Sequence, residues 1–339
     1  MKNKFLPIIA VCLIVVLIAL IVIVQSIPSD HKPDPEVPAQ SSAPTIPATS
    51  PTEPSTVPTE PTFNTEATTP TETVPPTEAT QPPTEATEPP TQPPTQPGVE
   101  YIGSLYTREQ LMAMENVRKG YGPGTTSNGV RPSYPISLQK TYEQYGGHFI
   151  APDNNCIYLT FDCGYEYQDI MADILDTLKE KDVKAVFFVT MQFIRENPEY
   201  VQRMIDEGHA VGNHTRRHKE LPNMTIDAIV ADVMEVHQYM LDHFNYKMTL
   251  FRPPTGSFST RSLAVMQSLG YKSVLWSFAH KDWETANQPD PAQALKTITG
   301  RHHSGAIYLL HAVSRTNADV LGEAIDFFRA QGYQLELYQ

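Results

Sequence analysis

Apolar positions between residues 156 and 339 follow two alternating spacings. Short runs rich in β-branched and aromatic residues indicate buried strands, and between them apolar residues recur every three or four positions, as on one face of a helix. The apolar runs lie at 157–162, 183–190, 209–214, 249–254, 271–277, 306–313 and 333–338. The helical segments lie at 169–182, 198–208, 225–244, 260–270, 291–300 and 318–332. This alternation predicts a parallel α/β fold, either an open doubly wound sheet or a (β/α) barrel.

The pattern is weaker immediately upstream. Residues 100–155 are marked by glycine, proline and tyrosine and contain one weak helical segment, at 108–120. We interpret 100–155 as an ordered N-terminal arm that lies on the barrel, and 156–339 as the main domain.

Residues 1–26 have the pattern of a transmembrane anchor. Residues 5–24 carry no charge, and twenty apolar residues in a helix are long enough to cross the ~30 Å hydrocarbon core. Lys2 and Lys4 precede this run, which predicts a cytoplasmic N-terminus and an extracellular remainder of a single-pass membrane protein. A cleaved signal peptide is the alternative. We favour the anchor, because the apolar run is long and no small-residue cleavage site follows it.

Residues 27–99 form a linker of low complexity. The stretch 28–98 holds 20 of the 31 prolines together with many threonine and glutamate residues, and it offers little apolar surface to bury. Such a composition predicts a disordered, polyproline-biased stalk. Eleven acids and one lysine between residues 30 and 100 contribute −10 of the formal charge of −13. The acidity therefore belongs to the stalk, and no basic patch indicates a nucleic-acid partner.

The cysteines argue against a disulfide. Cys12 lies in the predicted membrane segment, while Cys156 and Cys163 flank one predicted strand at a separation of seven residues. Along an extended strand this separation is ~23 Å, far beyond the reach of a disulfide bond.

Chemically reactive side chains collect at the ends of the predicted strands. In parallel α/β folds these carboxyl ends share one edge, where active sites form. Each residue also has an ordinary explanation when it is taken singly: a helix cap, an exposed histidine pair, a loop anchor, a surface acid or a buried core histidine. Their joint position favours a metal-assisted hydrolase. The residues are Asp162, Cys163, His214, His218, Arg252, Asp282 and His311.

Five motifs in register give the chain a resemblance to a known family. The motifs read TFDCGY, HTRRH, RPPTGSFS, KDW and LLH in chain order. They resemble those of the polysaccharide deacetylases with the NodB-homology domain, carbohydrate esterase family four, over about residues 156–337. The stretches YPISLQKTYEQYGGHFI, SFAHKDW and LLHAVSRTNADVL are similar to one branch, the delta-lactam-biosynthetic de-N-acetylases. The resemblance implies a distorted (β/α) barrel, consistent with the alternation.

The resemblance also implies roles for individual residues. Asp162 matches the catalytic base, Arg252 the residue that holds that base, and His311 the catalytic acid. Asp282 matches the acid that tunes His311. The metal-binding histidines correspond to His214 and His218, and the implied cofactor is a divalent metal ion, with zinc favoured.

One position departs from the family pattern. Cys163 stands where the family has its metal-binding aspartate. A thiolate is a good zinc ligand, so two histidines and a cysteine form a plausible site. The alternative is a small residue that touches no metal, with a weakly bound or absent ion.

The function implied is removal of N-acetyl groups from peptidoglycan. The branch indicates N-acetylmuramic acid as the target, on the route to muramic δ-lactam in spore cortex. The alternatives are a deacetylase of N-acetylglucosamine in peptidoglycan or chitooligosaccharide, and a non-catalytic wall-binding module with a decayed metal site. Intact Asp162, Arg252 and His311 argue against decay, because a binding module needs none of them.

Overall fold

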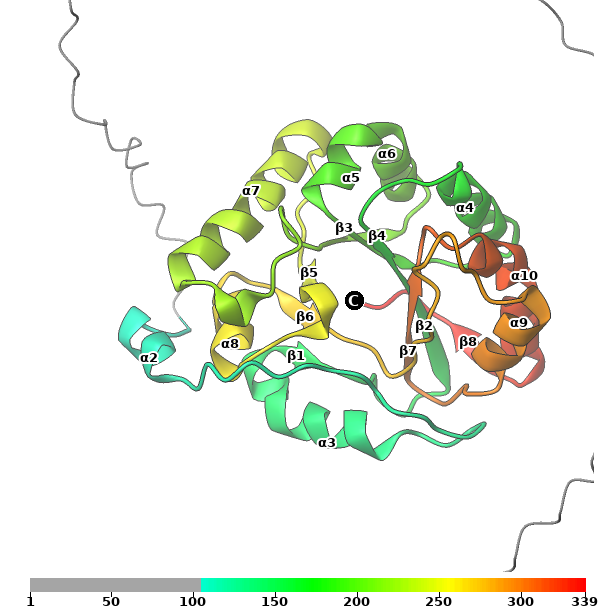
Figure 1. Cartoon of the computed structure of the whole chain (residues 1–339), viewed down its shortest axis with the longest axis horizontal. Coiled ribbons are helices and arrows are strands. Elements are labelled where there is room, and N and C mark those ends of the chain that lie inside the picture. The colour runs from blue at the N-terminus through cyan, green and yellow to red at the C-terminus, as the bar shows by residue number, and fades with distance from the viewer. Residues whose placement is uncertain (1–104) are drawn as a thin grey trace, which may run out of the picture. The chain divides into compact units, whose positions relative to one another are not determined.

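The computed structural model describes residues 105–339. Its strands form one parallel sheet that curls into a distorted barrel (Figure 1). The strand order is β1-β6-β5-β4-β3-β2-β7, and β8 pairs with the start of β2. The strands are β1 Gly147–His148, β2 Cys156–Cys163, β3 Val186–Val189, β4 Ala210–Asn213, β5 Leu250–Phe251, β6 Lys272–Val274, β7 Ala306–His311 and β8 Gln334–Leu335.

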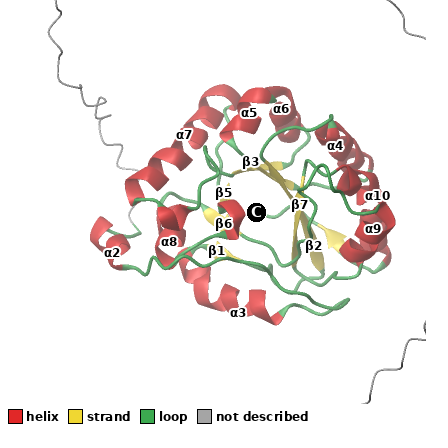
Figure 2. Cartoon of the chain, viewed as in Figure 1, coloured by secondary structure: helices red, strands yellow, loops and turns green. Residues whose placement is uncertain are grey.

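Helices surround the outer side of the curled sheet (Figure 2). This arrangement confirms the predicted barrel and not the open doubly wound alternative. The α-helices are α2 Arg108–Ala113, α3 Ser133–Tyr142, α4 Ile170–Glu180, α5 Met191–Glu196, α6 Pro198–Asp206, α7 Ile226–Phe244, α8 Thr260–Ser268, α9 Pro291–Thr299 and α10 Arg315–Ala330. Short 3₁₀ turns lie at Glu143–Tyr145, Leu221–Asn223 and Pro254–Gly256.

The barrel is irregular along one side. The apolar run 271–277 is not one strand: it forms β6 and then continues as coil to Phe278, which makes a single parallel bridge to Tyr308 of β7. This bridge links the β6 side of the sheet to the β7 side.

The segment upstream of residue 156 takes part in the barrel itself. β1 pairs with β6 in the register Gly147 to Ser273 and His148 to Val274, and α3 precedes it on the outside (Figure 1). The predicted arm thus supplies an edge strand, which the sequence pattern did not indicate because that strand is only two residues long.

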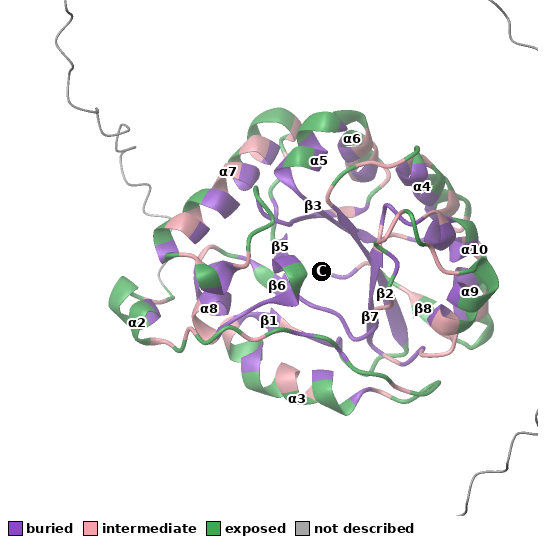
Figure 3. Ribbon diagram, viewed as in Figure 1, coloured by how far each residue is buried: buried purple, intermediate pink, exposed green. Residues whose placement is uncertain are grey.

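The hydrophobic core lies on both faces of β2. Every residue of β2 is buried, and Figure 3 shows the strands as the most uniformly buried part of the chain. Alternate side chains leave a strand on opposite faces. Accordingly, Ile157, Leu159 and Phe161 pack in the outer core with the helices, whereas Tyr158 packs in the inner core of the barrel. Each side chain on β2 therefore points either to the outer core or to the interior of the barrel.

The predictions for the N-terminal region lie outside the described residues. These are the anchor at 1–26, the linker at 27–99 and Cys12. Among the helices of residues 105–339, none combines the length and the apolar composition that a membrane crossing requires.

Candidate active site

A cleft of about 890 Å³ lies at the carboxyl ends of the strands. Its walls include Asp162, His214, His218 and His311, each at or just after the end of a strand. Asp162 and His311 are direct neighbours across β2 and β7. The structure therefore brings together the acid and the histidines that the sequence predicted at separate strand ends.

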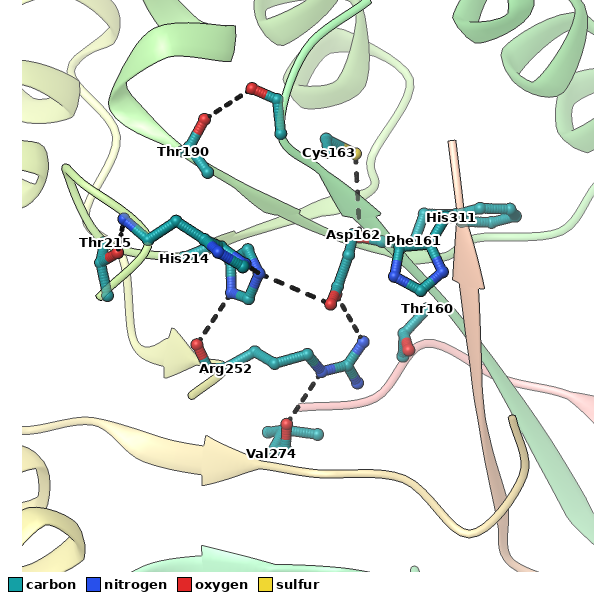
Figure 4. Close-up of polar contacts among 12 residues, drawn as sticks. Thr160, Phe161, Asp162, Cys163, Thr190, His214, Thr215, Arg252, Val274 and His311 are labelled. Carbon is teal, nitrogen blue, oxygen red and sulfur yellow. Dashed lines mark hydrogen bonds and ion pairs between the residues drawn. The ribbon is translucent and has the colours of Figure 1, made fainter. Parts of the chain in front are cut away.

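Arg252 holds the carboxylate of Asp162 (Figure 4). Its Nη1 donates to Oδ1 of Asp162 at 2.9 Å and its Nε donates to the carbonyl oxygen of Val274 at 3.0 Å, and the arginine has no exposed surface. The ring of Phe188 lies 4.1 Å from the guanidinium carbon, close enough for a cation–π contact. Gly212 makes room for this ring, because a Cβ there would lie 2.5 Å from it. The guanidinium is thus fixed on all sides and orients the acid.

The charges around Asp162 keep it ionised. Burial by itself raises the pKa of this carboxyl, but the positive charge of Arg252 and contributions from His214 and His311 outweigh it, so the pKa lies below its usual value. Asp162 is therefore a carboxylate at neutral pH, the form that accepts a proton from water.

His214 and His218 lie on a loop after β4, and a strained turn brings their rings together. Their Nε2 atoms are 3.2 Å apart. Thr215 and His218 have φ angles of 70° and 51°, in the left-handed region that non-glycine residues seldom adopt. The N–H of Thr215 donates to Oδ1 of Asn213 and its Oγ1 accepts from the N–H of His218, both at 2.9 Å. The spacing of four residues between the histidines thus works through a hydrogen-bonded turn that belongs to no helix.

The protonation of these rings suits metal binding. Nδ1 of His214 lies 2.9 Å from the carbonyl oxygen of Arg252, and a carbonyl only accepts, so Nδ1 carries the proton and Nε2 keeps its lone pair. Burial lowers the pKa of His214 to about 4 and also lowers the pKa of His218. Both imidazoles are neutral at physiological pH, which is the form that binds a metal ion.

The residues present fit a divalent ion held through two histidines. Two converging imidazole nitrogens suit zinc and related ions. Oδ2 of Asp162 lies 3.6 Å from Nε2 of His214, but this carboxylate is already held by Arg252. Within residues 105–339, no three histidine, cysteine or carboxylate side chains surround a common metal position. His214 and His218 are therefore the residues that would hold the ion.

Cys163 is the predicted site residue that the structure does not bring to the others. Its side chain has no exposed surface and packs in the outer core with Phe161, and Sγ lies 3.7 Å from the carbonyl oxygen of Phe161. Because β2 continues as regular strand through Cys163, the thiol leaves it on the face opposite Asp162 (Figure 4). Burial also raises the pKa of the thiol well above its usual value. This placement gives no support to a metal-bound thiolate. Cys163 and Cys156 are both free, as predicted.

Asp282 and His311 form the second charged pair of the cleft. Oδ1 of Asp282 lies 2.7 Å from Nδ1 of His311, and the carboxylate side chain has no exposed surface. Burial by itself lowers the pKa of His311, but the hydrogen bond and charge of Asp282 outweigh it, so this pKa lies above its usual value. Trp283 stands edge-on to the imidazole with 5.5 Å between ring centroids. His311 is thus oriented so that its other nitrogen, Nε2, can hold a proton at the cleft.

The sequence did not indicate several other residues of the cleft. Tyr121, from the arm, lines one wall and donates its hydroxyl to the carbonyl oxygen of Trp276 at 2.5 Å. Arg216 and Arg217 also line the cleft, and Asp232, a buried acid of α7, accepts the backbone N–H of Arg216 at 2.9 Å and Nε of Arg217 at 2.6 Å. The sequence holds one signal for this contact: Asp232 lies on the buried face of an amphipathic helix. A buried acid needs a partner, so its position could have predicted a polar contact there.

The chain is similar in sequence to known polysaccharide deacetylases. Residues 150–274 match the family model for polysaccharide deacetylases. An uncharacterised 30.6 kDa protein of Geobacillus stearothermophilus is 41% identical over 223 residues, which cover 65% of this chain and 84% of that protein. The peptidoglycan-N-acetylmuramic acid deacetylase PdaA of Bacillus subtilis is 37% identical over 226 residues, which cover 66% of this chain and 86% of PdaA.

The fold is also that of a solved relative. The structure of Bacillus subtilis PdaA, a family 4 carbohydrate esterase, matches with a TM-score of 0.62 at 36% identity, covering 66% of this chain and 96% of that one. On sequence, fold and the arrangement of the motif residues, the chain belongs to the polysaccharide deacetylase family.

Proposed function

We propose that this protein removes N-acetyl groups from peptidoglycan, with N-acetylmuramic acid as the target sugar. One observation carries the reaction type. An ionised Asp162 fixed by Arg252 and a His311 fixed by Asp282 face one cleft, beside two converging neutral imidazoles. A pair of groups of this kind, one ready to accept a proton and one ready to give it, is what amide hydrolysis requires.

Asp162 acts as the general base. An acetamide is a poor electrophile, so the attacking water must lose a proton as it adds to the carbonyl carbon. The carboxylate of Asp162 takes this proton, and Arg252 stabilises the ionised form and fixes its direction.

His311 acts as the general acid. An amine leaves only when its nitrogen has been protonated, because otherwise the tetrahedral intermediate expels the water again. Asp282 raises the pKa of His311, which favours the protonated imidazole, and this proton passes to the departing nitrogen.

Deacetylases of this family are generally metal-dependent, and His214 and His218 are the residues that would hold the ion. When bound, a divalent ion, with zinc favoured, polarises the acetyl carbonyl and supplies positive charge where negative charge develops on its oxygen.

The choice of sugar rests on two arginines of the cleft and on the similarity to PdaA. Arg216 and Arg217 line the cleft, where Nε of Arg216 pairs with Glu235 at 3.0 Å and Nε of Arg217 pairs with Asp232 at 2.6 Å, and an anionic sugar would meet these two side chains there. N-acetylmuramic acid carries a lactyl carboxyl group once its peptide has been removed, whereas N-acetylglucosamine has no carboxyl. The amine freed on a muramic residue could close a lactam with that carboxyl in a later step, the route to spore-cortex δ-lactam. The similarity to PdaA, which is named for N-acetylmuramic acid, supports the same choice.

We further propose that residues 1–26 anchor the enzyme in the cell membrane and that the catalytic unit faces the wall. The uncharged run 5–24 and the lysines before it support this location. Extraction of cell membranes with carbonate should leave the full-length protein in the pellet, and release into the supernatant would contradict the anchor.

The test of the reaction uses the full-length chain on purified peptidoglycan. Acetate release is measured with zinc, with cobalt and with a chelator, and mass spectrometry of the digested glycan identifies the sugar that has lost 42 mass units, the mass of an acetyl group less one hydrogen. Asp162→Asn keeps the shape but loses the charge, and it should lower turnover about 100- to 10,000-fold. Asp227→Asn is the matched control, because Asp227 is an exposed acid whose partner among the described residues is Arg108.

Three results would count against the proposal. Near-wild-type turnover of Asp162→Asn would refute the base. Loss of acetyl groups from glucosamine alone would refute the choice of sugar. Glycan binding without acetate release under every metal condition would favour the wall-binding module.

A further inference from the structure

The hydrogen bonds of Asp282 extend beyond His311. Oδ2 of Asp282 accepts the backbone N–H of His311 at 2.8 Å and the side-chain amide of Asn317 at 2.5 Å. The amide oxygen of Asn317 lies 3.0 Å from Nε2 of His280. Four side chains therefore form one continuous chain in the order His311, Asp282, Asn317, His280. The last two lie within the stretches SFAHKDW and LLHAVSRTNADVL but have no role in the reaction described above.

The chemistry of these groups gives the chain a single direction. The carboxylate of Asp282 only accepts, so the NH₂ group of Asn317 faces it and the amide oxygen faces His280. His280 must therefore donate from Nε2. The same carboxylate requires the proton of His311 to lie on Nδ1, which leaves Nε2 of His311 for the cleft.

Asn317 is held as firmly as the acid that it contacts. It lies in the first turn of α10, where its N–H donates to the side chain of Ser314, the N-cap residue, at 3.1 Å, and it is 1% exposed. A buried amide at this position satisfies both of its polar ends through Asp282 and His280. Burial of such a group is costly unless both ends are paired.

Asn317 also separates Asp282 from a competing histidine. Nε2 of His280 is 3.8 Å from Oδ2 of Asp282, too far for a hydrogen bond but close enough to form one after a small rotation. Because Nε2–H of His280 donates to the Asn317 oxygen, it does not donate to Asp282. The carboxylate of Asp282 therefore stays hydrogen-bonded to His311.

We propose that Asn317 and His280 are positioning residues for His311: they fix the orientation of Asp282 and keep it from pairing with His280. This inference rests on the proposed deacetylation for its kinetic readout. Neither residue needs to touch the reacting atoms. Loss of the Asn317 amide lets Asp282 turn between two histidines, so His311 points its Nε2 proton at the leaving nitrogen for a smaller fraction of the time.

The experiment uses the purified full-length chain and its peptidoglycan substrate. Asn317→Leu removes both hydrogen bonds and keeps the branched shape of the side chain, and it should lower kcat about tenfold or more with KM changed less than twofold, a loss similar to that seen when the outer partner of a metal-binding histidine is removed. His280→Leu should lower kcat, and His280→Gln, whose amide donates from nearly the same place as Nε2, should lose less. Asn197→Leu is the matched control, because Asn197 is a buried asparagine outside this network.

A second readout does not depend on turnover. In protein with ¹⁵N-labelled histidine, Nδ1 of His311 should give a strongly downfield, exchange-protected proton signal that Asn317→Leu weakens and Asn197→Leu leaves in place. An unchanged kcat together with an unchanged signal in Asn317→Leu would overturn the inference, as would equal loss of kcat in Asn317→Leu and Asn197→Leu. An inactive wild-type protein would refute the proposed function, and the signal would then still decide the positioning role.

Discussion

The ion pair of Asp162 and Arg252 allows a quantitative test of how the site is built. The change is Arg252→Met, which removes the charge and keeps an unbranched side chain against the ring of Phe188. In the structure, Arg252 has no exposed surface and donates to Asp162 at 2.9 Å, to the carbonyl of Val274 at 3.0 Å and to that of Leu275 at 3.3 Å. All three acceptors lose their donor in the variant.

The size of the effect follows from the charge left behind. Removal of one partner of a buried ion pair costs about 3–5 kcal/mol, because the other charge stays desolvated without compensation. A buried carbonyl without a donor costs about 1–3 kcal/mol, less where water reaches it. We therefore expect Arg252→Met to lower the free energy of unfolding at pH 7 by about 3–5 kcal/mol.

The assay is urea unfolding of the full-length chain, followed by the fluorescence of its two tryptophans. Both lie at the site: Trp276 and Trp283 line the cleft. Asp162→Asn and the double variant Asp162→Asn/Arg252→Met complete a mutant cycle. Since the double variant keeps neither charge of this pair, its loss should be about 2 kcal/mol smaller than the sum of the single losses.

The pH dependence of stability tests the direction in which the pKa of Asp162 is shifted in the wild type and in the variant. In the wild type the folded-state pKa of Asp162 is lowered, so the stabilisation is complete above the unfolded value of about 3.9 and is lost as pH falls through the folded pKa. In Arg252→Met, burial acts without a cation and raises the pKa of Asp162. The variant then gains stability as pH falls through that raised pKa, so its deficit should be larger at pH 7 than at pH 5.

Three measurements would refute this reasoning. They are a deficit below about 1 kcal/mol at pH 7, a deficit that is the same at pH 7 and pH 5, and a coupling energy below about 0.5 kcal/mol. Any of them would mean that the charge of Asp162 is compensated by groups other than Arg252.

Three further predictions concern the acid, the metal and the cysteine. Asp282→Asn should move the alkaline limb of the pH profile of kcat/KM to lower pH, because Asp282 raises the pKa of His311 and activity falls as pH rises through that pKa; an unmoved limb would assign the acid to another group. His218→Asn should weaken zinc binding in calorimetry about tenfold or more, and equal affinity would place the ion elsewhere. Cys163→Ala should leave zinc affinity within twofold of wild type and lower the free energy of unfolding by about 1 kcal/mol. A clear loss of zinc affinity would instead support Cys163 as a thiolate ligand of the metal.

The sequence by itself predicted a parallel α/β fold and most of the site, and the choice of a barrel over an open sheet came from the family resemblance. The spacing of apolar residues predicted alternating strands and helices, because strand and helix burial repeat with different local periods. Strand ends then located Asp162, His214, Arg252 and His311, because the carboxyl ends of parallel strands share one edge whatever the details of packing.

Elements stabilised mainly by tertiary contacts escaped this reasoning. Helix α3 buries only Pro135 and Tyr142 of its ten residues, so its pattern is weak. Strand β1 is two residues long and exists through its pairing with β6. The predicted strand 271–277 is interrupted after Val274, because the chain leaves β6 to bridge β7 at Phe278.

Only the tertiary structure decided how neighbouring side chains divide between the cleft and the core. Cys163 directly follows Asp162, and a turn at the end of the strand could have directed both into the site. The structure instead continues β2 through Cys163, so the thiol joins the outer core while the carboxylate meets Arg252. Likewise, Asn317 meets Asp282 only because α10 begins beside β7. Sequence spacing sets which face of an element a residue occupies, but the curvature of the sheet and contacts between distant segments set what that face meets.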